Sequence, residues 1–279
     1  MYEQVSHSLL NTILSELSPS IEKEDLRHFF TRLGANFYSI HSIFSLLYGD
    51  RDDFQMQMQR LVETMARQYI RRPQALQQVD IERESDHNWF LSQKWVGMAL
   101  YSDGFAKNLK DLQSKAHYFQ ELGVNLIHIM PILRCPRTNS DGGYAVSDFR
   151  QIDSRVGTMA ELESLVGELH KRDILTVLDV VLNHTSDEHD WACRARQGDP
   201  AYQDYYYIFD NREIPDMFEA SMPEIFPETS PGNFTWNEEM GKWVMTVFNN
   251  FQWDLNYSNP AVFIEILDII LFWSNRGAD

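Results

Sequence analysis

The sequence predicts an α/β protein built from parallel strand–helix–strand units that follow an all-helical region. Residues 175–184 are a continuous apolar run ending in Asn183 and His184, which is typical of a parallel strand buried on both faces. Two earlier apolar runs are separated from it and from each other by amphipathic helix patterns, and this alternation predicts right-handed parallel units. Polar residues at the carboxyl ends of such strands are where α/β folds place their chemistry.

Residues 1–90 are expected to form a helical domain. At 26–47 the apolar residues recur at spacings of three and four, and residues 54–69 repeat this pattern. Gly49 is expected to end the first of these helices. The strongly charged segment at 78–88 is expected to be a linker, and no catalytic constellation is legible in this domain.

Three strands are expected after the helical domain, at 95–101, 124–131 and 175–184. The helix at 109–122 joins the first two strands. Thr158 and Glu161 form a capping box for the second connecting helix, since each side chain can accept a hydrogen bond from an exposed backbone N–H.

A long excursion rich in aromatic residues, proline and aspartate follows from 185 to about 257. Structureless loops of that length are uncommon in compact domains, so the excursion is expected to fold as a small inserted subdomain. Asn259 is expected to cap the last helix, with Pro260 in its first turn and Gly277 at its end.

Composition narrows the functional classes. The chain has 279 residues, 43% of them hydrophobic, enough for one large domain or for one with a smaller companion. The net charge of -17 argues against electrostatic binding to nucleic acid or to an anionic membrane.

No apolar run has the length of a membrane span and the first residues lack a signal-peptide pattern, so a cytoplasmic protein is expected. Cys135 and Cys193 have no metal-site spacing and are expected to be ordinary reduced thiols, and neither a metal nor another cofactor is expected.

Three short motifs lie at or beyond strand ends. They are Asp141-Gly-Gly-Tyr144 after the second strand, Asn183-His184 at the end of the third, and residues 248–256 at the end of the excursion. Each alone is weak, because Asp-Gly-Gly is usually a turn and a single histidine is usually structural. At one edge of one parallel sheet, however, the three motifs are expected to form a site together.

These motifs resemble sequences of a known family. Asp179-Val-Val-Leu-Asn-His184 resembles the first signature of the α-amylase superfamily, glycoside hydrolase family 13. The excursion resembles the B domain that emerges after the third barrel strand in that family. Within the family, the phrases at 140–146, 183–191 and 251–260 are similar to those of amylosucrases and sucrose hydrolases, which also have a helical N-terminal domain.

The resemblance implies an incomplete (β/α)8 TIM barrel. A closed barrel takes about 250 residues, so only its first three β/α units are expected here. The implied domains are a helical N-terminal domain at 1–90, the first part of the barrel at 91–184, the B domain at 185–257 and the third barrel helix at 258–279.

The implied activity is that of an amylosucrase-like glucosyltransferase of carbohydrate metabolism. Such an enzyme transfers glucose from sucrose to an α-1,4-glucan acceptor and releases fructose, by a retaining mechanism with an aspartate nucleophile and a glutamate acid/base. Alternatives are a sucrose hydrolase or another α-amylase-family glycosidase and, in a different class, a non-catalytic truncated fragment. The family's nucleophile and acid/base are expected beyond Asp279, so the chain alone is expected to be inactive. Sucrose and the glucan are the expected partners, and no protein partner is expected.

Five residues match positions that bind substrate in the family. Asp141 is expected to accept hydrogen bonds from sugar hydroxyls, and Tyr144 to stack beneath the glucose ring. His184 is expected to donate to the 6-hydroxyl region, Phe248 to line the same pocket and Gln252 to line an acceptor subsite. These residue types suit a sugar, which presents hydroxyl edges to polar groups and C–H faces to flat rings.

Other polar and aromatic residues near these motifs are expected to be structural. Asp179 is expected to support the fold, and Asn183 to form hydrogen bonds rather than bind calcium as the matching residue does in many α-amylases. His128 is expected to be a core histidine, and His189 and Trp191 to pack at the start of the inserted subdomain.

Overall fold

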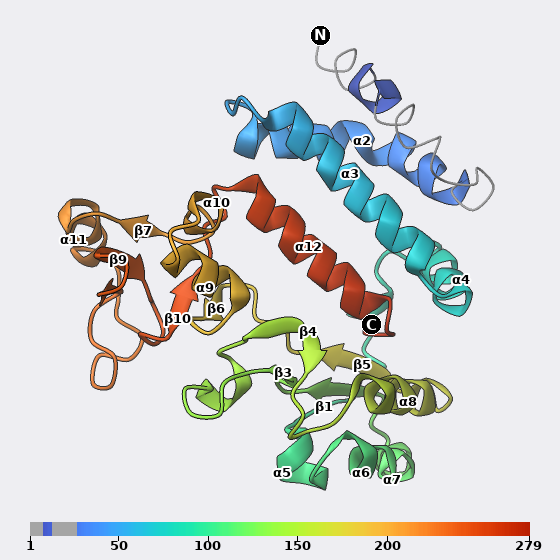
Figure 1. Cartoon of the computed structure of the whole chain (residues 1–279). Coiled ribbons are helices and arrows are strands. Elements are labelled where there is room, and N and C mark those ends of the chain that lie inside the picture. The colour runs from blue at the N-terminus through green and yellow to red at the C-terminus, as the bar shows by residue number, and fades with distance from the viewer. Residues whose placement is uncertain (1–7, 13–26) are drawn as a thin grey trace. The chain divides into compact units, whose positions relative to one another are not determined.

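The computed structural model describes residues 8–12 and 27–279 of the chain (Figure 1). The described residues fall into two compact units. One contains the residues up to His87 together with Ser258–Asn275, and the other contains Asn88–Tyr257 and Arg276–Asp279. None of the helices in the described ranges is long and apolar enough to cross a membrane.

In its described residues, the first unit consists of helices and their short connections. Its long helices are α2 (Arg27–Tyr48), α3 (Phe54–Arg71), α4 (Gln74–Glu84) and α12 (Pro260–Ser274). The two helices expected at 26–47 and 54–69 are confirmed within the described residues, and α2 ends directly before Gly49. Their apolar stripes meet in one core, which includes Leu33, Phe37, Phe44, Met58, Leu61, Val62 and Ile264.

Helix α12 packs in this helical unit, although the sequence assigned residues 258–279 to the barrel. Ile264 of α12 is buried in the core shared with α2 and α3. Gln68 Nε2 donates to Asp268 Oδ1 over 2.7 Å, and Asn275 Nδ2 donates to Gln68 Oε1 over 3.0 Å. These buried contacts explain why α12 belongs to the helical unit. The expected boundaries of the functional domains stay a prediction.

The segment at 78–88, expected to link the helical domain to the next, is helical up to Glu84 as part of α4, and the helical unit ends at His87. Gln, Glu, Arg and Ile tolerate a helix well, so a charged stretch of these residues forms one when an anchor is available. Asp80 supplies the anchor by accepting a hydrogen bond from Arg72 Nη2 over 2.7 Å.

The second unit contains a three-stranded parallel sheet in the order β1 (Gly97–Leu100), β2 (Leu126–Ile129) and β5 (Leu175–Leu178). Leu126 pairs with Gly97 on one side and with Leu175 on the other. The sheet with its connecting helices is a partial TIM barrel, as predicted. The helices are α5 (Ser102–Ala106), α6 (Leu109–Gln113), α7 (Ala116–Leu122) and α8 (Met159–His170).

The connections confirm one predicted cap and correct one predicted helix. Thr158 Oγ1 accepts from Glu161 N, and Glu161 Oε2 accepts from Thr158 N, so the capping box at α8 is present. The single helix expected at 109–122 is instead two short helices. Ser114 Oγ donates to the Asp111 carbonyl over 2.6 Å, a local bond that competes with the regular helical ladder.

The third strand ends earlier than predicted. Strand β5 stops at Leu178, and Asp179 N makes one last bond to the Ile129 carbonyl over 3.3 Å. Residues 180–183 then leave the sheet, and His184 begins a separate strand, β6 (His184–Ser186). Nor is β5 buried on both faces, because Val177 is 37% exposed. The apolar run is longer than the part that pairs with β2, and its last residues turn toward the returning end of the inserted excursion.

The excursion is folded, as expected. It begins with β6 and returns through β10 (Gln252–Asp254), which pairs antiparallel with β6. Between them lies a sheet in the order β7-β9-β8, and α9 (Asp190–Arg196), α10 (Pro200–Gln203) and α11 (Glu213–Glu219) accompany it (Figure 1). The strands of this sheet are β7 (Ile208–Phe209), β8 (Phe234–Asn237) and β9 (Lys242–Met245).

The remaining elements are short. Between β2 and α8 lie β3 (Leu133–Arg134) and β4 (Asp148–Ile152), with the 3-10 turn η3 (Asp141–Gly143) between them, and η2 (Trp89–Leu91) precedes β1. The predicted cap of α12 is present, with Asn259 Oδ1 accepting from Ala261 N over 2.9 Å. Gly277 was expected to end α12, but the helix ends at Ser274 with Asn275 as its cap.

Candidate functional site

The Asp-Gly-Gly motif is a turn held in an unusual backbone conformation. Asp141, Gly142 and Gly143 have φ values of +48°, +64° and +101°. A side chain at Gly143 is excluded sterically as well, since a Cβ atom there would lie 2.8 Å from Pro131 Cβ. This turn fixes the directions of Asp141 and of Tyr144, which follows it.

The β6–β10 ladder brings the other two motifs together. Gln252 is opposite Ser186 and Asp254 is opposite His184, so the start and the return of the excursion are aligned in register. Leu255 N donates to the Asn183 carbonyl over 2.9 Å and extends this pairing by one step.

All five predicted site residues lie in one cluster. Gln252 Nε2 lies 3.0 Å from Asp141 Oδ2 and also 3.0 Å from His184 Nε2. His184 Nε2 is 3.2 Å from the Tyr144 carbonyl oxygen, and the His184 ring centroid is 5.1 Å from that of Phe248. Asp141 is exposed and Phe248 is half-buried, so the cluster offers a carboxylate and an aromatic ring to the surface.

Gln252 does not line an open acceptor subsite, and that expectation is wrong. Its side chain is fully buried, with 0% of its surface exposed. A glutamine placed between two polar partners in the interior satisfies its own hydrogen-bonding groups there, which leaves none of them for a second sugar.

Burial determines the charge state of the cluster. Desolvation lowers the pKa of His184 to about 4, so the imidazole is neutral at pH 7. Desolvation raises the pKa of Tyr144, and its hydrogen bond to the Asp179 carboxylate raises it further, so the phenol stays protonated. The same effect raises the pKa of the buried Asp254 to about 6.

Several residues support the cluster from behind. Tyr144 Oη donates to Asp179 Oδ2 over 3.0 Å, which agrees with a supporting role for Asp179. His128 was expected in the core, but its ring is half-buried and Nε2 lies 3.5 Å from Asp179 Oδ2. Asn183 Nδ2 donates to Asp254 Oδ1 over 2.6 Å, the hydrogen-bonding role that was expected.

The two aromatic residues at the start of the excursion are packing residues, as predicted. His189 and Trp191 are buried, and their ring centroids are 4.4 Å apart. His189 Nδ1 also accepts a hydrogen bond from Trp191 N at the start of α9.

Three residues of this neighbourhood escaped the sequence argument. Tyr101, directly after β1, hydrogen-bonds to Tyr144. Asn249 Nδ2 donates to Gln252 Oε1 over 2.8 Å, and Asp254 accepts from Val247 N over 2.8 Å. The position of Tyr101 at the carboxyl end of a strand was an available signal, whereas nothing local indicates the partners of Asn249 and Asp254.

Asp279 is not part of the cluster. Its backbone N–H donates to the Thr176 carbonyl over 2.8 Å, and its Oδ2 accepts from Thr176 N over 2.9 Å. His170 Nε2 lies 2.8 Å from the same oxygen. These contacts place Asp279 beside the amino-terminal half of β5, at the end opposite the strand's exit toward His184.

Among the described residues there is no group of three His, Cys, Asp or Glu side chains that could hold a metal ion. Cys135 and Cys193 are both free thiols. Arg155 Nη2 lies 2.8 Å from Cys135 Sγ, and burial raises the pKa of this thiol.

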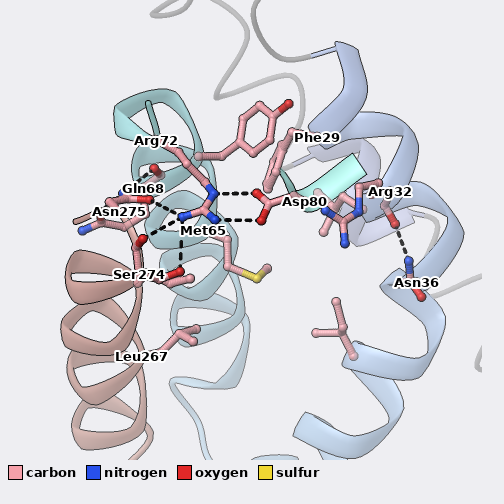
Figure 2. A pocket seen from close by; sticks show the side chains of 14 residues that line it. Phe29, Arg32, Asn36, Met65, Gln68, Arg72, Asp80, Leu267, Ser274 and Asn275 are labelled. Atoms are coloured by element: carbon pink, nitrogen blue, oxygen red, sulfur yellow. Dashed lines mark hydrogen bonds and ion pairs between the residues drawn. The ribbon is translucent and has the colours of Figure 1, made fainter. Parts of the chain in front are cut away.

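A cavity of about 450 Å³ lies within the helical unit (Figure 2). On its wall, Arg72 pairs with both carboxylate oxygens of Asp80 and donates to the Ser274 carbonyl over 2.9 Å. Gln68 and Asn275 are bonded to each other. Because these polar groups satisfy one another, they serve helix packing, and the residues lining the cavity include none of the five in the predicted site.

Comparison with known proteins shows the family. Residues 84–279 match the family model described as the catalytic domain of alpha amylase. The match covers well over half of the chain, and the chain therefore belongs to the α-amylase family, glycoside hydrolase family 13.

Relatives with known names include an oligo-1,6-glucosidase of Parageobacillus thermoglucosidasius, 35% identical over 175 residues. That alignment covers 62% of this chain and 30% of the relative. A trehalose synthase of Pimelobacter sp. (strain R48) is 34% identical over 199 residues, covering 67% of this chain and 34% of the relative. This chain thus spans about a third of the length of the curated relatives that it matches.

Solved structures agree with this assignment. A mutant of the trehalulose synthase MutB in complex with the substrate sucrose has a TM-score of 0.58 and 29% identity. It covers 66% of this chain, which spans 34% of that structure. The trehalose-6-phosphate hydrolase of Bacillus licheniformis has a TM-score of 0.59 and 29% identity, with 68% of this chain and 34% of that structure covered.

Proposed function

We propose that this chain carries the glucosyl-binding part of an amylosucrase-like enzyme, which transfers glucose from sucrose to an α-glucan. The observation that carries the proposal is the cluster itself. A carboxylate on Asp141, a neutral imidazole on His184 and a ring on Phe248 converge from three separate segments. This combination suits one glucosyl unit, with polar groups for its hydroxyls and an apolar face for its C–H groups.

Each group has a definite part in this proposal. The Asp141 carboxylate accepts hydrogen bonds from two neighbouring sugar hydroxyls. The His184 ring is only 4% exposed and its nitrogens contact Tyr144, Gln252 and Asn183, so it backs the sugar pocket as a neutral ring and places no positive charge there. Tyr144, whose hydroxyl is tied to Asp179, presents its ring rather than its polar end. Hydrogen bonds to hydroxyls that tighten as the oxocarbenium-like state forms contribute several kcal/mol, as an order of magnitude.

The cluster is suited to holding the sugar rather than to breaking its bond. Retaining glycosidases need two carboxyl groups about 5–5.5 Å apart, one on each side of the scissile bond. Of the nearby carboxylates, Asp179 is committed to Tyr144, and Asp254 is buried against Asn183 and Val247. The proposal therefore assigns no catalytic residue within the cluster.

Sucrose is favoured as the donor by the trehalulose synthase MutB, whose structure contains sucrose as substrate. A second candidate is hydrolysis, in a sucrose hydrolase or another glycosidase of the family. It is favoured by the relatives named as oligo-1,6-glucosidases. A non-catalytic, sugar-binding polypeptide is the third candidate, favoured by the absence of a suitable carboxylate pair in the cluster.

The test uses the purified 279-residue chain with sucrose. Binding is followed by NMR of 13C-labelled histidine side chains, with His184→Gln as the site variant. His117→Gln is the matched control, because the His117 side chain is 71% exposed. We expect sucrose to shift the His184 signal in the wild type and in the control. The site variant lacks this signal, so its expected loss of sucrose binding is measured by isothermal titration calorimetry, with the control variant alongside.

Reaction products are measured in the same samples. We expect no release of fructose at rates typical of enzymes. Fructose together with insoluble glucan would contradict the assignment of no catalytic residue and support transfer, whereas equal fructose and glucose would favour the hydrolase. No perturbation of His184 by sucrose at tens of millimolar would refute the proposed glucosyl site.

A further inference from the structure

Gln252 lies at the centre of the cluster but is sealed from solvent, so its function cannot be direct contact with a sugar. We propose that Gln252, oriented by Asn249, is a positioning residue that couples Asp141 and His184 into one sugar-binding unit. The benefit to sugar binding rests on the proposed function, while the coupling itself follows from the contacts below.

The orientation of the Gln252 amide is defined by two opposite contacts. Its Oε1 accepts from Asn249 Nδ2 over 2.8 Å, and its Nε2 donates to Asp141 Oδ2 over 3.0 Å. An ionised carboxylate can only accept, so the amide nitrogen must face Asp141. Asn249 then satisfies the oxygen on the other side, and a flipped amide would lose both bonds.

The same amide nitrogen lies 3.0 Å from His184 Nε2. On the other side of the ring, Asn183 Nδ2 lies 3.3 Å from His184 Nδ1, and its own orientation is set by the Asp254 carboxylate. Both ring nitrogens thus face an amide donor. The Tyr144 carbonyl oxygen, 3.2 Å from Nε2, can only accept and so favours one ring proton on Nε2. A second proton on Nδ1 would point at the Asn183 donor, so the arrangement favours the neutral imidazole.

Burial of the ring lowers the pKa of His184 to about 4. It outweighs the hydrogen bond to the Tyr144 carbonyl and the charge of the Asp141 carboxylate, which both favour the imidazolium. Gln252 separates the carboxylate from the ring, because its amide nitrogen donates to Asp141 and lies 3.0 Å from His184 Nε2. It therefore prevents a direct ion pair in which Asp141 would be drawn away from the sugar.

Gln252 also links elements that are far apart in the sequence. It lies 111 residues from Asp141 and 68 from His184. The Asp-Gly-Gly turn and the β6–β10 ladder therefore meet through one side chain. Removing its amide would leave the backbone ladder intact, yet free Asp141 to take up other rotamers.

The experiment compares four variants of the 279-residue chain by the pKa of His184, measured by NMR of labelled histidine. Gln252→Glu keeps the shape but replaces the amide donor with a carboxylate. Gln252→Met keeps the length and removes the hydrogen bonds. Asn249→Ala removes only the group that orients the amide, and Asn250→Ala is the control, since Asn250 is an exposed neighbour.

We expect Gln252→Glu to raise the pKa of His184 by more than one unit, since a carboxylate beside the ring favours its charged form. Gln252→Met and Asn249→Ala should each raise it by about one unit or less, and Asn250→Ala should leave it unchanged. Affinity for methyl α-glucoside should fall about tenfold in Gln252→Met, the effect of one hydrogen bond.

A purely space-filling Gln252 would give a different pattern. Gln252→Met, which keeps the length, would then leave the pKa of His184 as in the wild type, and this result would overturn the proposal. If the Gln252 variants do not fold, Asn249→Ala decides, because it leaves Gln252 in place. Failure of the wild type to bind the glucoside would refute the proposed function, and the pKa comparison would still decide the coupling.

Discussion

The turn before Tyr144 offers a sharp test of how the site is built, through the pair of variants Gly143→Ala and Gly142→Ala. Gly142 has φ +64°, within the left-handed region that other residues can enter, and a Cβ there would lie 3.4 Å from Tyr101 Oη. Gly143 has φ +101°, outside that region, and its Cβ would lie 2.8 Å from Pro131 Cβ and 3.3 Å from the Pro131 carbonyl oxygen.

The two costs differ for these reasons. Gly142→Ala carries the strain of one left-handed residue, about 1–2 kcal/mol. Gly143→Ala carries at least the same strain and adds the displacement of a packed proline, about 1–3 kcal/mol by analogy with overpacked cores. We therefore expect Gly143→Ala to be less stable than Gly142→Ala by about 1–3 kcal/mol.

The assay is urea unfolding followed by circular dichroism, with the slope against urea checked for equality between variants. Because the turn also aims Asp141, the glucoside affinity of folded Gly143→Ala should fall further than that of Gly142→Ala. Equal stabilities, within about 0.5 kcal/mol, would refute the claim that this turn requires a glycine at Gly143.

Three further predictions concern stability. His184 has a folded pKa below its unfolded value, so the unfolded state binds more protons between pH 4 and 6.5 and His184 makes the fold less stable as the pH falls. Asp254 has a folded pKa raised to about 6, so it makes the fold more stable as the pH falls from 6 to 3.8. Asp254→Asn should therefore steepen the acid loss by up to about 1.4 kcal/mol per pH unit, and unchanged urea midpoints relative to wild type at pH 4.5, 5.5 and 6.5 would exclude this. Arg72→Met should cost about 2 kcal/mol in thermal unfolding, because Asp80 and the Ser274 carbonyl lose a shared, mostly buried donor, whereas Arg71→Met at an exposed position should cost less than about 0.5 kcal/mol. Thr158→Ala should cost about 1 kcal/mol through loss of the α8 cap, with a cost near zero arguing that the capping box adds nothing to stability.

Local patterns predicted those elements whose burial follows a regular period. The apolar stripes of α2 and α3 and the caps at Thr158 and Asn259 could be identified because each depends on residues no more than four positions apart. The end of β5 could not, since Val180, Val181 and Leu182 remain apolar although they no longer pair with β2. Strand ends depend on where the neighbouring segments pair, which a local pattern does not contain.

The site residues, too, were predicted where a local motif marks them and misjudged where distant contacts decide their position. The motifs indicated which residues lie near the sheet edge, and the structure brings Asp141, His184 and Phe248 together. The position of Gln252 was misjudged because its burial depends on Asp141, far away in the sequence. The substrate roles of these residues stay predictions.

The three-residue ladder between β6 and β10 has a consequence for how this protein can change. It clamps both ends of the excursion within a few residues of His184 and Gln252, so the segment between them is a closed loop. The entropy of closing a flexible loop grows only slowly with length, by about 0.6 kcal/mol per doubling. Insertions between Asp187 and Val247 should therefore be tolerated, while the ladder keeps His184 and Gln252 in register at the proposed glucosyl site.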